Sequence, residues 1–159
     1  MDYAKLAIKT CVVACIVDDQ QQVLLTRRCI DPFCGQWVMP GGKIDHGEPL
    51  LQALHREVRE EVGIEVHVER LIDVYEHVAL GVNSDHYVIL YYRAQPLTRN
   101  VTPNGAEVTE AVWAPANALH DYDLTPGTRH VLAQVFPVRL VDPGEPADEL
   151  ACRNFTSSR

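Results

Sequence analysis

Three glutamates lie close together in the sequence, at Glu57, Glu60 and Glu61. If this stretch is helical, residues three and four positions apart share one face, which brings the three carboxylates together. Like charges at that spacing destabilise a helix by about 0.2–0.5 kcal/mol per pair. A solvated acidic face is one interpretation of such a run. The other is a site for a hard divalent cation, which prefers oxygen ligands and would offset the repulsion.

The residues that precede and flank these glutamates favour the cation site. Pro40-Gly41-Gly42 lies upstream, and glycines let the backbone approach a ligand closely or present a carbonyl oxygen to a metal ion. Asp45 and Glu48 add two further carboxylates. Arg56 adjoins the first of the three glutamates and can hold a carboxylate in a fixed orientation through a charge-assisted hydrogen bond.

The element that must position the glutamates is a helix over residues 49–62. Pro49 suits the first helical position, and Gly63 suits the position just past the end. Apolar residues recur at helical spacing and form the stripe that should face the core: Leu51, Leu54, Val58 and Val62. The glutamates then lie beside this stripe, near the protein interior.

The rest of the chain reads as strands followed by two short helices. Runs rich in β-branched and aromatic residues predict strands at 7–17, 23–27, 37–39, 64–78, 86–94 and 107–113. Short helices are expected at 115–120 and 127–136. From residue 137 the composition turns polar and rich in proline, which predicts an irregular tail. Helices on both sides of a mixed sheet are the economical α/β architecture for these elements.

Composition limits the classes of function. The chain has 159 residues and a formal charge of −8, which indicates one domain and disfavours a nucleic-acid-binding face. A bound polyanion would need a metal ion or a local group of basic residues. Five cysteines without a C-x-x-C pair favour a reducing compartment, and no apolar run is long enough to span a membrane. We therefore expect a cytoplasmic protein that does not interact with membranes.

Taken together, the residues from Gly42 to Ile64 form one pattern, Gly42-x5-Glu48-x7-Arg56-Glu57-Val58-x-Glu60-Glu61-x-Gly63-Ile64. Its nine defined positions within 23 residues resemble the complete signature box of the Nudix hydrolases. The resemblance extends over residues 7–136, including the approach to the box at Trp37 to Gly42. It implies a Nudix-like α/β/α sandwich with a central mixed sheet over residues 1–137, followed by the irregular tail at 138–159.

The resemblance also implies roles for residues of the box. Metal ligands for Mg²⁺ or Mn²⁺ are expected at Gly42, Glu57, Glu60 and Glu61. Arg56 and Glu48 would orient these ligands. The general base stays open between a glutamate of the box and a later one, either Glu107 or Glu110.

Three residues outside the box are candidates for binding the substrate. Arg27 and Arg28 follow the second predicted strand and could contact phosphate, although a solvated strand end would show the same residues. Trp37 could stack on a base, although a place in the core is the more common one for a tryptophan.

The implied reaction is attack by water on a phosphorus atom of a small nucleotide. The expected substrate is a nucleoside diphosphate linked to another moiety, of the ADP-ribose or nucleotide-sugar type. A nucleoside triphosphate pyrophosphohydrolase that sanitises the nucleotide pool is the alternative enzyme. Outside enzymes, a non-catalytic nucleotide-binding Nudix module and a calcium-binding structural module are the alternatives. A homodimer is compatible with all of these interpretations.

Overall fold

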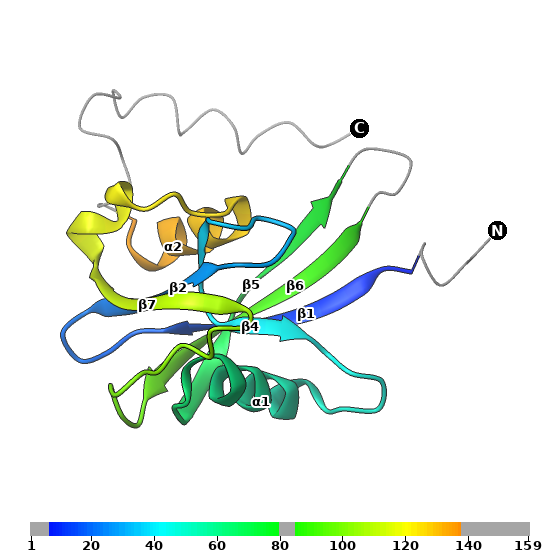
Figure 1. Ribbon diagram of the computed structural model, residues 1–159, viewed down its shortest axis with the longest axis horizontal. Coiled ribbons are helices and arrows are strands. Elements are labelled where there is room, and N and C mark those ends of the chain that lie inside the picture. Colours follow the sequence, from blue (N-terminus) through cyan, green and yellow to red (C-terminus); the bar gives the residue numbers. More distant parts are fainter. Residues whose placement is uncertain (1–6, 80–84, 138–159) are drawn as a thin grey trace.

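The computed structural model describes residues 7–79 and 85–137, which form two β-sheets. The first sheet is mixed and has the strand order β4 (Gly41–Lys43), β1 (Lys9–Ile16), β6 (His86–Pro96) and β5 (Val66–Val78). The second is antiparallel, in the order β3 (Trp37–Val38), β2 (Gln22–Arg28) and β7 (Val108–Pro115). Figure 1 shows these strands in the middle of the molecule.

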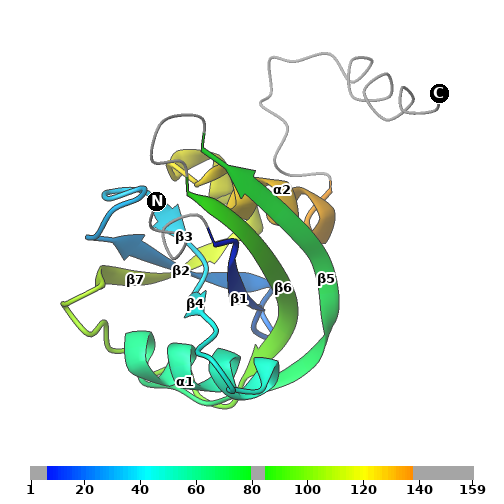
Figure 2. The same ribbon diagram turned by 90° about the vertical axis from the view of Figure 1, so that its right-hand side faces the viewer.

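Helices cover the strands on two sides. α1 (Leu50–Val62) lies on one side, and α2 (Pro126–Val135) lies on the other with a 3₁₀ helix at Ala116–Asp121, as Figure 2 shows. The predicted α/β/α sandwich with a mixed sheet is therefore confirmed. β1 and β2 are joined by a tight turn but belong to different sheets. Among the described residues, the bridge between Val17 and Val23 is the one β-pairing that connects them.

The two faces of strand β1 pack in two separate hydrophobic clusters of the interior. Successive side chains of a strand point to opposite faces. Val12, Ala14 and Ile16 pack in the cluster beneath α1, whereas Cys15 packs in the cluster beneath α2. β1 pairs in parallel with β6, so that Lys9 lies opposite Tyr87 and Ile16 opposite Ala94. The pairing carries the same division of faces into β6.

Helix α1 matches the predicted helix except at its N-terminus. Pro49 is the N-cap, with extended backbone, and not the first helical residue. Of the expected apolar stripe, Leu54, Val58 and Val62 are buried, whereas Leu51 is 44% exposed. Ala53, not Leu51, takes the buried position in the first turn. Gly63 ends the helix as predicted, in the left-handed conformation.

A strand follows residue 39 where none was predicted. Gly41–Lys43 forms β4, which pairs antiparallel with β1 and places Gly42 opposite Val12. The predicted strands left these residues out because proline and glycine are rare within strands. Here glycine is required, because a Cβ at Gly41 would lie 2.3 Å from the carbonyl oxygen of Val12. The close passage of β4 beside β1 brings the backbone next to α1.

The predicted irregular tail at 138–159 lies outside the residues that the structure describes. Within the described ranges, no helix has the length and apolar character needed to cross a membrane.

Candidate active site

The acidic face of α1 separates into a buried pair and an exposed member. Glu57 and Glu61 point inward and are buried, whereas the Glu60 side chain is 57% exposed. A third carboxylate reaches the buried pair from the start of β7. One oxygen from each of Glu57, Glu61 and Glu107 lies within 4.8 Å of the others. The structure thus groups two of the three predicted glutamates with one of the two later candidates.

Glycine backbone makes room for the buried carboxylates. A Cβ at Gly42 would lie 2.5 Å from the carboxyl carbon of Glu57, so no larger residue fits there without displacing Glu57. The backbone N–H of Gly41 donates a hydrogen bond of 3.1 Å to Oε2 of Glu61. The two glycines of β4 therefore serve as the wall against which the two glutamates rest.

Burial changes the acidity of both glutamates. Burial, together with the smaller effect of the charges of Glu57 and Glu107, outweighs the stabilising N–H of Gly41 and raises the pKa of Glu61 to about 8. Burial also raises the pKa of Glu57, against the opposing effect of Arg56. Carboxyl groups with raised pKa values in a pocket are typical of functional sites. Carboxyl groups of this kind are also typical of cation sites, because a bound cation offsets the repulsion between neighbouring carboxylates.

Arg56 fixes the loop before α1 to the helix. Its Nε and Nη2 donate hydrogen bonds of 2.8 and 2.9 Å to the two oxygens of Glu48, which forms a bidentate pair. Nη1 donates to Glu57 at 2.8 Å and to Glu60 at 3.2 Å, and Nη2 also donates to the carbonyl of Lys43 at 3.1 Å. Arg56 thus holds Glu57 by one oxygen, as the sequence predicted for a residue that orients a carboxylate.

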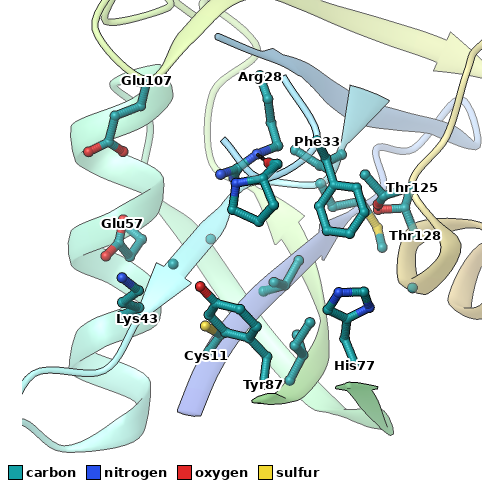
Figure 3. A pocket seen from close by; sticks show the side chains of 18 of the residues that line it. Cys11, Arg28, Phe33, Lys43, Glu57, His77, Tyr87, Glu107, Thr125 and Thr128 are labelled. Atoms are coloured by element: carbon teal, nitrogen blue, oxygen red, sulfur yellow. Dashed lines mark hydrogen bonds between the residues drawn. The ribbon is translucent and has the colours of Figure 1, made fainter. Parts of the chain in front are cut away.

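Hydrogen bonds to the backbone around Glu107 fix the position of this residue. The side-chain oxygen of Asn104 accepts hydrogen bonds from the N–H groups of Ala106, Glu107 and Val108. The carbonyl of Glu107 in turn accepts a hydrogen bond of 2.9 Å from the N–H of Cys29. These bonds fix the start of β7, so that the Glu107 side chain extends toward α1 (Figure 3).

The carboxylates lie at one end of a pocket of about 360 Å³. Its walls come from β1, β5, β6, the glycines of β4, the loop after β2 and the first residues of α2. Basic residues at the carboxylate end are Arg28, Lys43 and Arg56. Figure 3 shows Glu57, Lys43 and Glu107 on one side of the pocket, with Phe33, Thr125 and Thr128 on the other.

Of the remaining predicted site residues, one lines the pocket and three do not. Arg28 lines the pocket, and its Nε donates to the carbonyl of Pro32 at 2.9 Å. Arg27 and Glu110 form an ion pair of 2.8 Å with each other and are not among the described residues that line the pocket. Trp37 also lies outside this lining; its ring packs edge-on against Tyr122, with 5.2 Å between centroids.

Sequence reasoning left out the residues on the far side of the pocket. They include three from one face of β6 and two from one face of β5, namely Tyr87, Ile89, Tyr91, Tyr75 and His77. Alternation of residues along a strand was a usable signal, because it places each of these sets on one face. What the sequence did not show is that this face borders a cavity as well as the core beneath α2.

The arrangement suits a divalent cation and a phosphate chain. Carboxylate oxygens are the ligands that Mg²⁺ and Mn²⁺ prefer, and Glu57, Glu61 and Glu107 bring three of them to one point. Arg28 and Lys43 line the same end of the pocket and can pair with phosphate oxygens. The donor set and the close approach of glycine backbone therefore fit the metal that the box implies.

Comparison with known proteins agrees with this geometry. The NUDIX domain family model matches residues 8–135. The 8-oxo-dGDP phosphatase NUDT18 of Homo sapiens is 31% identical over 108 residues, which cover 68% of this chain; the chain spans about a third (32%) of that protein. The nucleoside triphosphatase NudI of Escherichia fergusonii is 30% identical over 132 residues, which cover 77% of this chain and 93% of NudI.

Solved structures show the same fold. A MutT Nudix hydrolase from Burkholderia pseudomallei, 31% identical, covers 81% of this chain and 98% of its own with a TM-score of 0.68. The Nudix domain of Shewanella oneidensis NrtR, solved with ADP ribose, covers 81% and 86% with a TM-score of 0.70 at 24% identity, which supports the fold alone. The box, the pocket and these matches lead to one conclusion: the chain belongs to the Nudix hydrolase family, whose members act on phosphorus anhydrides.

Proposed function

We propose that this protein is a Mg²⁺- or Mn²⁺-dependent hydrolase that cleaves the pyrophosphate bond of a nucleoside diphosphate linked to another moiety. The observation that carries the proposal is the convergence of Glu57, Glu61 and Glu107 at one end of a pocket that also presents Arg28 and Lys43. A diphosphate brings negative charge toward carboxylates, so it needs a cation between them.

The proposal assigns a separate role to each group of residues in the site. Glu57, Glu61 and Glu107 would hold the metal, which when bound lowers the pKa of water and offsets charge on the phosphates. Arg56 keeps the carboxylate of Glu57 in position. Arg28 and Lys43 would contact phosphate oxygens. Of the two later glutamates, Glu107 can serve as ligand or general base because it reaches the pocket, whereas Glu110 is engaged by Arg27 on the outside.

A nucleoside triphosphate is the second candidate substrate. One relative supports it by name, NudI as a nucleoside triphosphatase, whereas NUDT18 is named for a free nucleoside diphosphate, 8-oxo-dGDP. The carboxylates and basic residues at one end of the pocket have the chemistry to bind the phosphates of either candidate.

A hydrolysis screen with Mg²⁺ and Mn²⁺ tests the proposal directly. The panel is ADP-ribose, nucleotide sugars, dinucleoside polyphosphates and (d)NTPs, with products separated by chromatography. We expect the highest kcat/KM for a nucleoside diphosphate joined to a sugar. In ¹⁸O-water the label should appear in a phosphate product. A clear preference for (d)NTPs would establish the second candidate, and no turnover with either metal would support the non-catalytic module.

The metal site can be tested without a substrate. A ligand that binds only the folded state raises its stability, so millimolar Mg²⁺ or Mn²⁺ should raise the Tm of the protein. Glu61→Gln should lose most of this increase because it removes a buried ligand. Glu65→Gln, which changes an exposed glutamate paired with Arg59, is the matched control and should keep the increase. Equal metal-induced shifts in wild type and Glu61→Gln would remove Glu61 from the site.

The two later glutamates provide a matched comparison. Glu107→Gln should lower kcat by about 100-fold or more, the range seen when a general acid–base group is removed. Glu110→Gln breaks only an exposed ion pair with Arg27, and such pairs contribute about 0–1 kcal/mol, so its activity should stay near that of wild type. If Glu110→Gln is the more damaging variant, the assignment of Glu107 is wrong.

Arg56→Lys tests whether Arg56 positions a carboxylate or contacts the substrate. Lysine keeps the charge but loses the planar fork that holds both oxygens of Glu48, so we expect kcat to fall about 10–100-fold. KM should change little, since the groups that bind ground-state substrate remain. Arg59→Lys, on the same helix and paired with Glu65, is the control. A raised KM at normal kcat would make Arg56 a substrate contact.

A further inference from the structure

Glu107 differs from the other two carboxylates of the site in what holds its side chain. Glu57 and Glu61 are buried and accept hydrogen bonds, from Arg56 and from the N–H of Gly41. Glu107 is exposed, and among the residues that the structure describes no hydrogen bond or ion pair engages its carboxylate. An exposed glutamate has many accessible rotamers, so the place of this carboxylate beside α1 depends on where the backbone of residue 107 lies.

The segment between β6 and β7 is bonded to the C-terminal end of α1. The last four carbonyls of a helix have no partner within the helix. Two of them accept hydrogen bonds from this segment: the N–H of Thr102 donates to the carbonyl of Val62 at 2.9 Å, and the N–H of Asn104 donates to the carbonyl of Glu61 at 3.0 Å. Pro103 lies between these two donors and has no N–H to leave unpaired. The backbone of Asn104 is thus attached to a residue of the candidate metal site.

The side chain of Asn104 makes a second attachment, to the start of β7. Its Oδ1 accepts hydrogen bonds of 3.0, 3.0 and 3.3 Å from the N–H groups of three successive residues, Ala106, Glu107 and Val108. Gly105 allows the tight turn between the two, because its φ of +74° lies in the left-handed region. The position of residue 107 is therefore fixed relative to Asn104, and through Asn104 relative to Glu61.

A metal site tolerates little movement of its ligands. One oxygen from each of Glu57, Glu61 and Glu107 lies within 4.8 Å of the others, although Glu107 comes from a different element. Ligand groups must be held within about 0.5 Å of the productive geometry. Figure 3 shows Glu107 reaching α1 from outside the helix, so a loose turn before β7 would take one carboxylate out of the set.

We propose that Asn104 is a positioning residue that determines the metal affinity of the site by tying Glu107 to Glu61. Asn104 is not among the described residues that line the pocket, so its side chain acts through the carboxylate of Glu107 and not by contact with a metal ion or a phosphate. This inference rests on the proposed function, takes Glu107 as a metal ligand, and adds a residue outside the Nudix box to the metal site.

Binding of Mn²⁺ in the absence of substrate tests the inference, with free Mn²⁺ measured by electron paramagnetic resonance. Groups that orient metal ligands typically account for about 10–100-fold in metal affinity. Asn104→Ala removes the acceptor oxygen, so the Kd for Mn²⁺ should rise at least about 10-fold. Amide hydrogens of residues 106–108 should also exchange faster with solvent. Asn104→Asp keeps an acceptor oxygen and should restore both the slow exchange and most of the affinity.

A double-mutant cycle shows whether Asn104 acts through Glu107. Glu107→Gln should itself weaken Mn²⁺ binding, and adding Asn104→Ala to it should weaken binding no further, because residues that act as one unit are not additive. Asn100→Ala is the matched control in the same segment. Within the described part of the chain its side chain makes no hydrogen bond, so its Kd should equal that of wild type.

The outcomes separate this inference from the proposed function. If wild type binds no Mn²⁺, the proposed function fails and the inference fails with it. If wild type binds Mn²⁺ and Asn104→Ala binds it equally tightly, the inference alone is overturned and Asn104 only stabilises the turn. Additive effects of Asn104→Ala and Glu107→Gln would also overturn it, since the Asn104 side chain would then act elsewhere.

Discussion

Two carboxylates pressed against a glycine backbone are the constraint on which the rest of the site depends. Glu57 and Glu61 are buried on α1, and β4 passes so close that only glycine fits at positions 41 and 42. Buried carboxylates are unfavourable unless hydrogen bonds or opposite charges stabilise them. The surrounding residues supply part of this stabilisation, through Arg56 for Glu57 and the N–H of Gly41 for Glu61.

The stabilisation that the chain provides is unequal. Glu57 has a guanidinium partner, whereas Glu61 has one neutral donor. Burial, with a smaller contribution from the charges of Glu57 and Glu107, raises the pKa of Glu61 to about 8. Without a cation, Glu61 therefore holds a proton for much of the time at neutral pH. This incomplete balance suits an ion-binding site, because it leaves negative charge that a cation can offset.

Much of this arrangement could be predicted from the sequence. The spacing of Glu57, Glu60 and Glu61 placed the acidic helix face correctly, because helical periodicity is a local property. The division of that face into buried Glu57 and Glu61 and exposed Glu60 depends on where β4 passes, which is a tertiary feature. The choice between Glu107 and Glu110 has the same origin, since Asn104 turns the chain immediately before β7.

The aromatic residues of the pocket, Phe33, His77 and Tyr87, could not be brought together from local sequence patterns, for a related reason. His77 and Tyr87 are ten residues apart in sequence and face each other only because β5 and β6 pair in one register. A shift of β5 by one residue in that register would turn the side chain of His77 away from the pocket. Phe33 comes from a loop whose conformation no periodic pattern describes.

The parallel pairing of β1 with β6 also determines when the pocket can exist. It joins residues 9–16 to residues 87–94, with the whole of α1 and β5 between them in the chain. Parallel contacts between distant segments form slowly, since the loop between them must close before the contacts stabilise it. During synthesis on the ribosome, the acidic helix is complete well before the strand that completes the opposite wall. The enclosed site can therefore form only once β6 has joined β1 and both Glu107 and the start of α2 have followed.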